Sequence, residues 1–252
     1  VMRVANTAYF GMKNFRNIST IEHAIAIIGY EHLSYILLQM PFLKMIHVND
    51  ETFDRIGFLR HSIATGVIAK IMSTTLRIAN PHEVYISGIV HDIGIIIIYQ
   101  HFREAWRIIN SLVCKKNVSR LVAEREVFSV DHGYIGAALL ENWNIPKSIT
   151  EGVKFHHSPG ESELFKNNTI ITYLGNEFSE RIDFDKDFND FDYFLDKHKD
   201  FIYCMGDRGV RFTPSDEVIF FEKIYTLLHG VRGYLQGTME GEKEIHDTCS
   251  CC

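Results

Sequence analysis

Four widely separated stretches of this chain place histidine at or near the end of a predicted helix. The stretches are Arg60-His61-Ser62, His91-Asp92-Ile93-Gly94, Asp131-His132-Gly133 and His156-His157. Helical proteins build metal centres from side chains on facing helices, and a recurring set of imidazoles with a carboxylate suits a transition metal. The chain therefore needs a fold that brings four distant helix ends to one place.

Apolar residues recur mostly at the spacing of an α-helix and few strand patterns are present, so we predict an all-α protein. Ser19-Thr20-Ile21-Glu22 is typical of a capping box, before a helix that ends at Gly29. Asn80-Pro81 starts another helix, whose apolar stripe continues to Ile93 and places the pair His91-Asp92 beside a buried face. Further helices are predicted over 31–46, 54–73, 101–115, 118–128, 132–143, 147–155 and 169–181.

The length of 252 residues permits one large core, or one core with a small appendage. We predict a helical domain over 1–181, an acidic aromatic linker or insertion over 182–214, a C-terminal helix over 215–236 that packs on the main body, and a tail over 237–252. In the linker, aspartates alternate with phenylalanine and tyrosine. That pattern suits either a docking surface for a basic partner or a loop that covers the helical body.

The composition argues against several classes of partner. A net charge of -6 without a basic stripe does not suit nucleic-acid binding, which needs clustered Lys and Arg. The most apolar run, Ile93 to Tyr99, is too short to span a bilayer, and the first residues lack the pattern of a secretory signal. Cys114 and Cys204 stand alone, while the three cysteines near the C-terminus are interpreted as incidental thiols. We therefore expect a cytoplasmic protein with no membrane partner.

Several motifs together resemble a known family. The opening Arg3-Val4-Ala5-Asn6-Thr7-Ala8-Tyr9-Phe10-Gly11, the four histidine stretches and Trp143-Asn144-Ile145-Pro146 are similar to the HDOD family of bacterial signalling domains. The resemblance runs from the first residue to about Arg181. Members of that family usually have further helices before the opening motif, so we expect this chain to be truncated at its N-terminus.

The resemblance implies an all-α, HD-domain-like helical bundle with a C-terminal helical extension. It also implies kinship with HD metal-dependent phosphohydrolases and with HD-GYP phosphodiesterases of cyclic di-GMP, which bind one or more divalent metals. Carried over residue by residue, the resemblance implies a ligand set of His61, His91, Asp92, His132, His156, His157 and Asn176. Whether His157 binds metal, or His156 alone does so, stays open.

Three departures from the catalytic relatives are visible. Asn176 stands where those enzymes have a final aspartate, and a neutral amide contributes no charge to offset a dication. Ile95 follows Gly94, where HD-GYP enzymes have a lysine that contacts the substrate phosphate. The Gly-Tyr-Pro loop of those enzymes is replaced by Ser158-Pro159-Gly160-Glu161.

Histidine-rich ligation with one carboxylate favours iron, manganese or zinc over magnesium, which prefers oxygen ligands. Of these three metals, we expect iron to be the one that the site binds. The competing hypothesis is a metal-free cluster, in which His61, His91 and Asp92 form hydrogen bonds inherited from an enzyme ancestor.

Two functions remain open. The first is a non-catalytic signalling module that binds a partner signalling protein or a small ligand, with the metal serving structure or sensing. The second is a metal-dependent phosphohydrolase or phosphodiesterase that acts on a nucleotide such as cyclic di-GMP. The missing cation at Ile95 and the amide of Asn176 favour the first. The oligomeric state, including a homodimer, also stays open.

Overall fold

The computed structural model describes residues 20, 22–23, 26, 53–180 and 197. The chain divides into two compact units, 1–47 with 225–252 and 48–224, and the second unit holds all the described helices treated below. The predicted helices over 31–46 and 215–236, the acidic segment and the domain boundaries after 181 lie outside the described residues. Glu22, His23 and Ala26 are helical, as the prediction for 19–29 requires.

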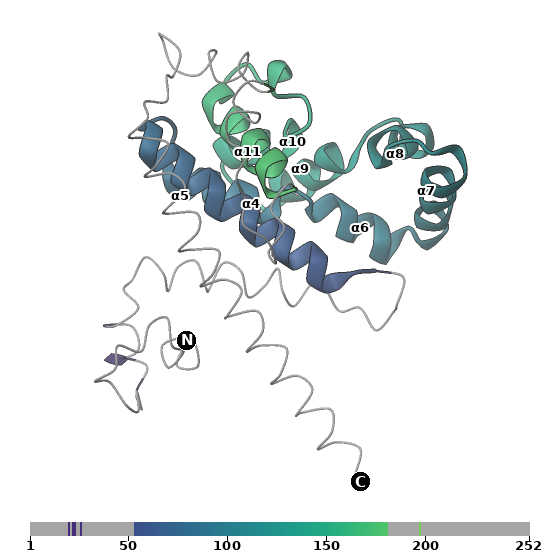
Figure 1. Ribbon diagram of the computed structural model, residues 1–252, viewed down its shortest axis with the longest axis horizontal. Coiled ribbons are helices and arrows are strands. Elements are labelled where there is room, and N and C mark those ends of the chain that lie inside the picture. Colours follow the sequence, from purple (N-terminus) through teal and green to yellow (C-terminus); the bar gives the residue numbers. More distant parts are fainter. Residues whose placement is uncertain (1–19, 21, 24–25, 27–52, 181–196, 198–252) are drawn as a thin grey trace. The chain divides into compact units, whose positions relative to one another are not determined.

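The described part of the chain is all-α, which confirms the predicted fold class, and it contains no strand. Its elements are α4 (Arg55–Leu76), α5 (Pro81–Val90), α6 (Ile93–His101), α7 (Arg103–Lys116), α8 (Arg120–Phe128), α9 (His132–Asn142), α10 (Lys147–Lys154), the short 3-10 helix η1 (Pro159–Glu161) and α11 (Lys166–Ser179). Figure 1 shows their arrangement.

Polar side chains fix where several of these helices begin. Asp54 accepts a hydrogen bond from the Gly57 amide at the start of α4, and Asn80 accepts one from the His82 amide at the start of α5. Asp131 does the same for α9, with the Gly133 amide at 3.1 Å. Such caps satisfy amides that have no partner within the helix. The cap at Asp131 makes His132 the first residue of α9.

One prediction about α5 is wrong. The apolar stripe suggested a helix that continues past the His91-Asp92 pair to Ile93, but α5 ends at Val90 and α6 begins at Ile93, with a turn between them. Adjacent residues of a continuous helix point in different directions, about 100° apart. The turn releases the pair from that constraint, so both side chains reach the same cluster.

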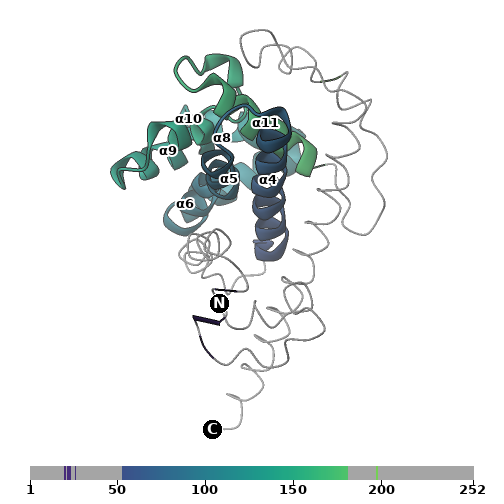
Figure 2. The same ribbon diagram turned by 90° about the vertical axis from the view of Figure 1, so that its left-hand side faces the viewer.

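Helix α4 is the longest of the described helices and packs against α5 and α11, while α10 packs against α5, α9 and α11 (Figures 1 and 2). Helix α6 packs against α9, and α7 pairs with α8. The largest fully buried side chains come mainly from α4, α6 and α11, and include Ile68, Met72, Ile96 and Phe178. This apolar core holds the ends of α4, α5, α9 and α10 in fixed positions.

The segment Pro81–His101 is long and apolar enough to cross a membrane when judged by length and composition alone. Of its most apolar window, 67% is buried inside the protein. The segment is also divided into α5 and α6 by the turn at His91 and Asp92. These features are those of core helices in a globular protein.

Glycine allows α6 to approach α9 very closely. A Cβ atom at Gly94 would collide with the backbone carbonyl of His132. Backbone cannot move aside as a flexible side chain can, so only glycine fits at this crossing. The contact places the turn that carries Asp92 directly against the start of α9.

We predict that Gly94→Ala lowers the free energy of unfolding by about 1–3 kcal/mol, because the added methyl group overpacks this crossing. Gly160→Ala is the matched control, since nothing lies within 4 Å of a Cβ at Gly160. Its effect should stay within about 0.5 kcal/mol. Urea unfolding of both variants measures the difference, and equal stability of the two would contradict the close approach.

Candidate metal centre

Four segments of the chain bring metal-binding side chains to one buried place. His61 comes from α4, His91 and Asp92 from the α5–α6 turn, His132 from the start of α9, and His156 and His157 from just beyond α10. Their potential ligand atoms form two groups that share Asp92, and within each group these atoms lie within 4.8 Å of one another. The geometry brings together six of the seven ligands expected from the sequence.

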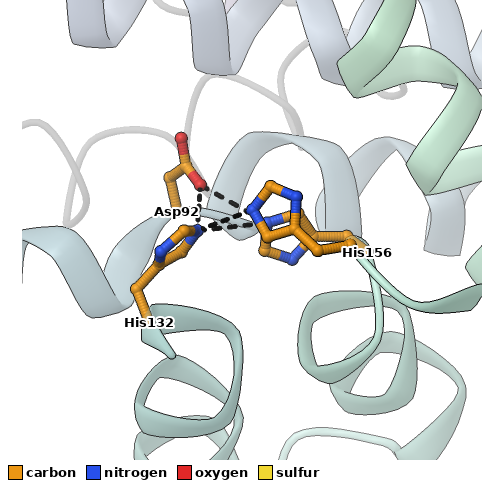
Figure 3. A group of neighbouring side chains, drawn as sticks. Asp92, His132 and His156 are labelled. Carbon is orange, nitrogen blue, oxygen red and sulfur yellow. Dashed lines mark hydrogen bonds and ion pairs between the residues drawn. The ribbon is translucent and has the colours of Figure 1, made fainter. Parts of the chain in front are cut away.

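The first group, which we call the His132 half, contains Asp92, His132, His156 and His157. Figure 3 labels Asp92, His132 and His156. Asp92 Oδ1 lies 3.0 Å from His132 Nε2 and 3.5 Å from His156 Nε2. His132 Nε2 also lies 3.3 Å from His156 Nε2 and 3.0 Å from His157 Nε2. Four potential ligand atoms therefore lie within 4.8 Å of one another.

The second group, which we call the His61 half, contains His61, His91 and the other oxygen of Asp92. Asp92 Oδ2 lies 3.2 Å from His91 Nε2 and 3.6 Å from His61 Nε2. The two Nε2 atoms are 3.1 Å apart. Asp92 thus turns one carboxylate oxygen toward each half.

The spacing of the ligand atoms fits a metal ion. A tetrahedral zinc site with bonds of about 2.0–2.1 Å has neighbouring ligand atoms about 3.3 Å apart. Four of the separations in the His132 half, at 3.0 to 3.5 Å, bracket that value. The donor set of imidazole nitrogens with one carboxylate also suits iron, manganese or zinc.

The outer nitrogens of the imidazoles are arranged as in metal sites. His91 Nδ1 donates to the Gly88 carbonyl at 2.8 Å, and His156 Nδ1 donates to the Val153 carbonyl at 2.6 Å. Because carbonyl oxygens only accept, Nδ1 carries a proton in both rings, which leaves Nε2 as the atom that can bind a metal. Metal-bound histidines typically donate their second N–H in this way. The Nε2 atoms of these rings therefore converge on one place, where they could bind a cation together.

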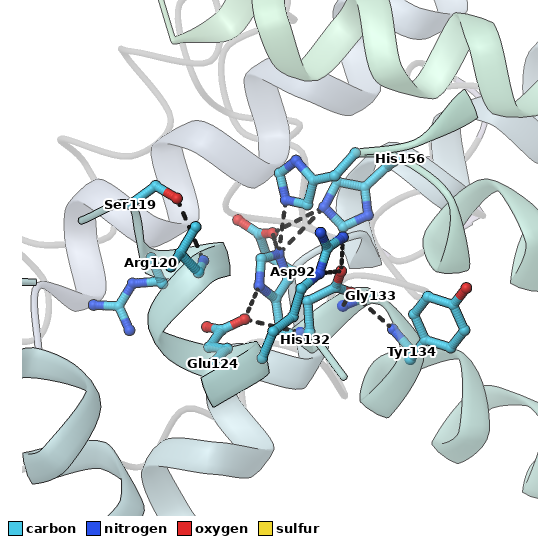
Figure 4. Close-up of polar contacts among 12 residues, drawn as sticks. Asp92, Ser119, Arg120, Glu124, His132, Gly133, Tyr134 and His156 are labelled. Carbon is cyan, nitrogen blue, oxygen red and sulfur yellow. Dashed lines mark hydrogen bonds and ion pairs between the residues drawn. The ribbon is translucent and has the colours of Figure 1, made fainter. Parts of the chain in front are cut away.

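Glu124 is a functional residue that sequence reasoning missed. It is fully buried on α8, and its Oε2 accepts hydrogen bonds from His132 Nδ1 at 2.7 Å and from the His132 backbone amide at 2.9 Å (Figure 4). Its other oxygen, Oε1, has no hydrogen-bond partner in the described structure. Its place directly after the apolar run Leu121-Val122-Ala123 was the available signal in the sequence.

The electrostatics of the cluster follow from its burial. Burial alone would raise the pKa of Asp92, but His91, His132 and His156 outweigh it and hold that pKa well below its usual range. Burial opposes charge on His132, yet hydrogen bonds to Asp92 and Glu124 raise its pKa to about 10. Without a metal, His132 is therefore an imidazolium between two carboxylates. A metal at its Nε2 must displace that proton.

Three other histidines of the cluster are kept neutral. Burial and the neighbouring His91 lower the pKa of His61 to about 4. Burial also lowers the pKa of His156, and burial together with His156 lowers that of His157. Neutral imidazole is the form that binds a metal. These three rings are therefore ready to bind a metal at neutral pH without losing a proton.

Asn176, the seventh expected ligand, lies on α11 beside His61. Its side chain lies close enough to His61 to influence the pKa of that ring, and the residue is almost completely buried. Its Nδ2 atom has no hydrogen-bond partner among the described groups. The residue therefore borders the His61 half, with an amide in a place where a carboxylate would supply a charge.

The site reaches solvent at its two edges. The His61 side chain is 23% exposed, whereas the side chains of His91 and His156 are fully buried. His157 is also partly exposed. An ion or a small ligand can therefore approach either half without unfolding the core.

A sequence model of the HDOD domain matches residues 1–159. The chain belongs to the HDOD family. The matched range of this HDOD protein includes six of the expected ligands, whereas Asn176 on α11 lies beyond it.

Solved structures share the fold. A candidate phosphohydrolase from Shewanella amazonensis SB2B superposes with a TM-score of 0.72 at 18% identity, over 93% of this chain and 80% of that one. An HDOD domain protein of unknown function from Geobacter sulfurreducens gives a TM-score of 0.63 at 18% identity, over 95% of this chain and 76% of that one.

A sequence relative is also found. An uncharacterized protein of Treponema pallidum is 25% identical over 171 residues, which is 66% of this chain. This HDOD chain covers 32% of the length of the Treponema pallidum protein.

We predict that Glu124→Gln weakens metal binding about 10–100-fold, because the charged acceptor behind His132 raises the basicity of that ligand. Glutamine keeps the size and an acceptor oxygen but removes the charge. Glu126→Gln is the matched control on the same helix, since Glu126 is exposed and pairs with Lys116. Zinc affinity measured by competition with a chromogenic chelator separates the two. Equal affinities would show that Glu124 does not support the site.

Proposed function

We propose that this HDOD domain is a signalling module that binds a divalent transition metal and acts by binding a partner protein or a small ligand, without catalysis. The observation that carries the proposal is a contrast within one site. The metal-binding side chains and their outer hydrogen bonds are complete enough to hold an ion, whereas two neighbouring cations, Lys154 and Arg125, are engaged elsewhere.

The engagement of these cations can be followed residue by residue. Lys154 Nζ lies over the rings of Tyr134 and Phe155, at 4.9 and 5.0 Å from their centroids. The Arg125 guanidinium pairs at 2.7 Å with Asp131, the residue that caps α9. The position after Gly94 is the apolar Ile95. A phosphate at the centre would therefore receive from these positions less of the charge that enzymes use to stabilise a phosphoryl group.

The metal has a direct structural role in this proposal. The ligands come from α4, the α5–α6 turn, α9 and the segment after α10, so one ion would cross-link parts of the chain that are distant in sequence. Binding to the folded state alone stabilises that state. Loss or exchange of the metal would change how firmly these helix ends are held, which offers a route to sensing. We expect iron first, then manganese or zinc.

A phosphohydrolase remains the second candidate, and one observation favours it. Asp92 turns its two oxygens toward two separate groups of imidazoles, and paired metals are a common device of phosphate-ester hydrolysis. In that reading the cations would be supplied by the two metals themselves. The substrate would be a nucleotide such as cyclic di-GMP.

We predict that iron- or manganese-loaded protein does not hydrolyse cyclic di-GMP, because Lys154 and Arg125 are engaged in other contacts and Ile95 offers no charge. Chromatography of the nucleotide after prolonged incubation measures the linear product, and elemental analysis of the same sample shows whether metal is bound. Linear product that disappears in Asp92→Ala would overturn the non-catalytic proposal. Protein that takes up no metal after loading would overturn the metal-binding proposal.

A further inference from the structure

We propose that this HDOD domain holds one divalent metal tightly in the His132 half, and that Asn176 prevents the His61 half from binding a second metal with comparable affinity. This inference rests on the proposed metal-binding function and adds the number of metals, their position and the residue that sets them. It follows from three differences between the halves.

The first difference is the number of ligands. The His132 half offers four potential ligand atoms: Oδ1 of Asp92 and Nε2 of His132, His156 and His157. The His61 half offers three atoms of the strong donor types, from His61, His91 and Asp92. Four ligands complete a tetrahedral site, whereas three leave a position to be filled by water or by a weak donor.

The second difference is the group behind each ligand. In the His132 half, His156 also donates to a neutral group, the Val153 carbonyl at 2.6 Å, but a fully buried carboxylate on Glu124 accepts the outer N–H of His132 at 2.7 Å. In the His61 half, the outer nitrogens meet neutral groups, namely the Gly88 carbonyl at 2.8 Å from His91 and the Ser179 hydroxyl at 3.0 Å from His61. Charged acceptors raise the donor strength of an imidazole more than neutral ones.

The third difference is the negative charge available. Both halves share the single carboxylate of Asp92, and Glu124 lies against His132 in the His132 half. A dication in the His132 half uses the charge of Asp92 and repels a second dication beside it. Asn176 borders the His61 half with a neutral amide. In the described structure the Nδ2 atom of Asn176 is buried and has no hydrogen-bond acceptor.

Asn176→Asp is the sharpest test of this inference, because it places a negative charge beside the His61 half. The substitution only replaces the amide NH2 group with an oxygen atom. The full chain and the variant are dialysed against excess zinc or manganese, and the bound metal per chain is measured by mass spectrometry. We expect one metal in the parent protein and two in Asn176→Asp. Asn142→Asp makes the same change at an exposed site on α9, and should stay at one.

A second pair of variants locates the tight metal and does not depend on the folding of Asn176→Asp. His157 and His61 are both partly exposed, so alanine should be tolerated at either position. We expect His157→Ala to weaken the tight metal by about tenfold or more, and His61→Ala to change its affinity by less than about twofold. Circular dichroism confirms that each variant keeps its helices.

The outcomes separate this inference from the proposed function. The inference would be overturned, with metal binding left intact, if the parent protein bound two metals with similar affinity. It would also be overturned if the affinity for a single metal fell in His61→Ala and not in His157→Ala. The same holds if folded Asn176→Asp still binds one metal. No metal in any variant would overturn the proposed function and the inference with it.

Discussion

The whole site depends on burying one carboxylate. Removing an ionised carboxylate from water is costly unless cations or hydrogen-bond donors surround it, and Asp92 lies in the interior at the centre of five imidazoles. Four of those imidazoles come from three other segments of the chain, so their positions must be fixed before Asp92 can be accommodated. The packed helices therefore supply the imidazoles that offset the cost of burying Asp92.

Close helix packing supplies those positions. Gly94 lets α6 touch the start of α9, and Gly88 lets α5 approach the backbone of α4 at Gly66. Larger residues at these crossings would move the helix ends apart and separate the ligands. Gly94, in the His-Asp motif, thus has a structural role: it has no side chain, and so it allows the two helices to approach closely.

Much of the fold and site could be predicted from the sequence, for identifiable reasons. Caps such as Asn80 and Asp131 mark helix starts locally, and apolar spacing marks the buried faces. The break at the His91-Asp92 turn was missed because an apolar stripe runs through it, with no glycine or proline at the pair itself. Glu124 was missed because its role depends on a contact with α9, and no spacing rule along α8 reveals that contact. Which carboxylate oxygen faces which imidazole is likewise a property of three-dimensional packing.

The imidazoles around Asp92 are arranged in a way that suits a metal and not hydrogen bonds alone. Anomalous X-ray scattering from crystals of the iron-loaded protein, recorded on both sides of the iron absorption edge, tests it most directly. We expect an anomalous peak enclosed by Asp92 Oδ1 and the Nε2 atoms of His132, His156 and His157. Imidazoles in direct contact with one another in such crystals, with no anomalous peak among them, would contradict it.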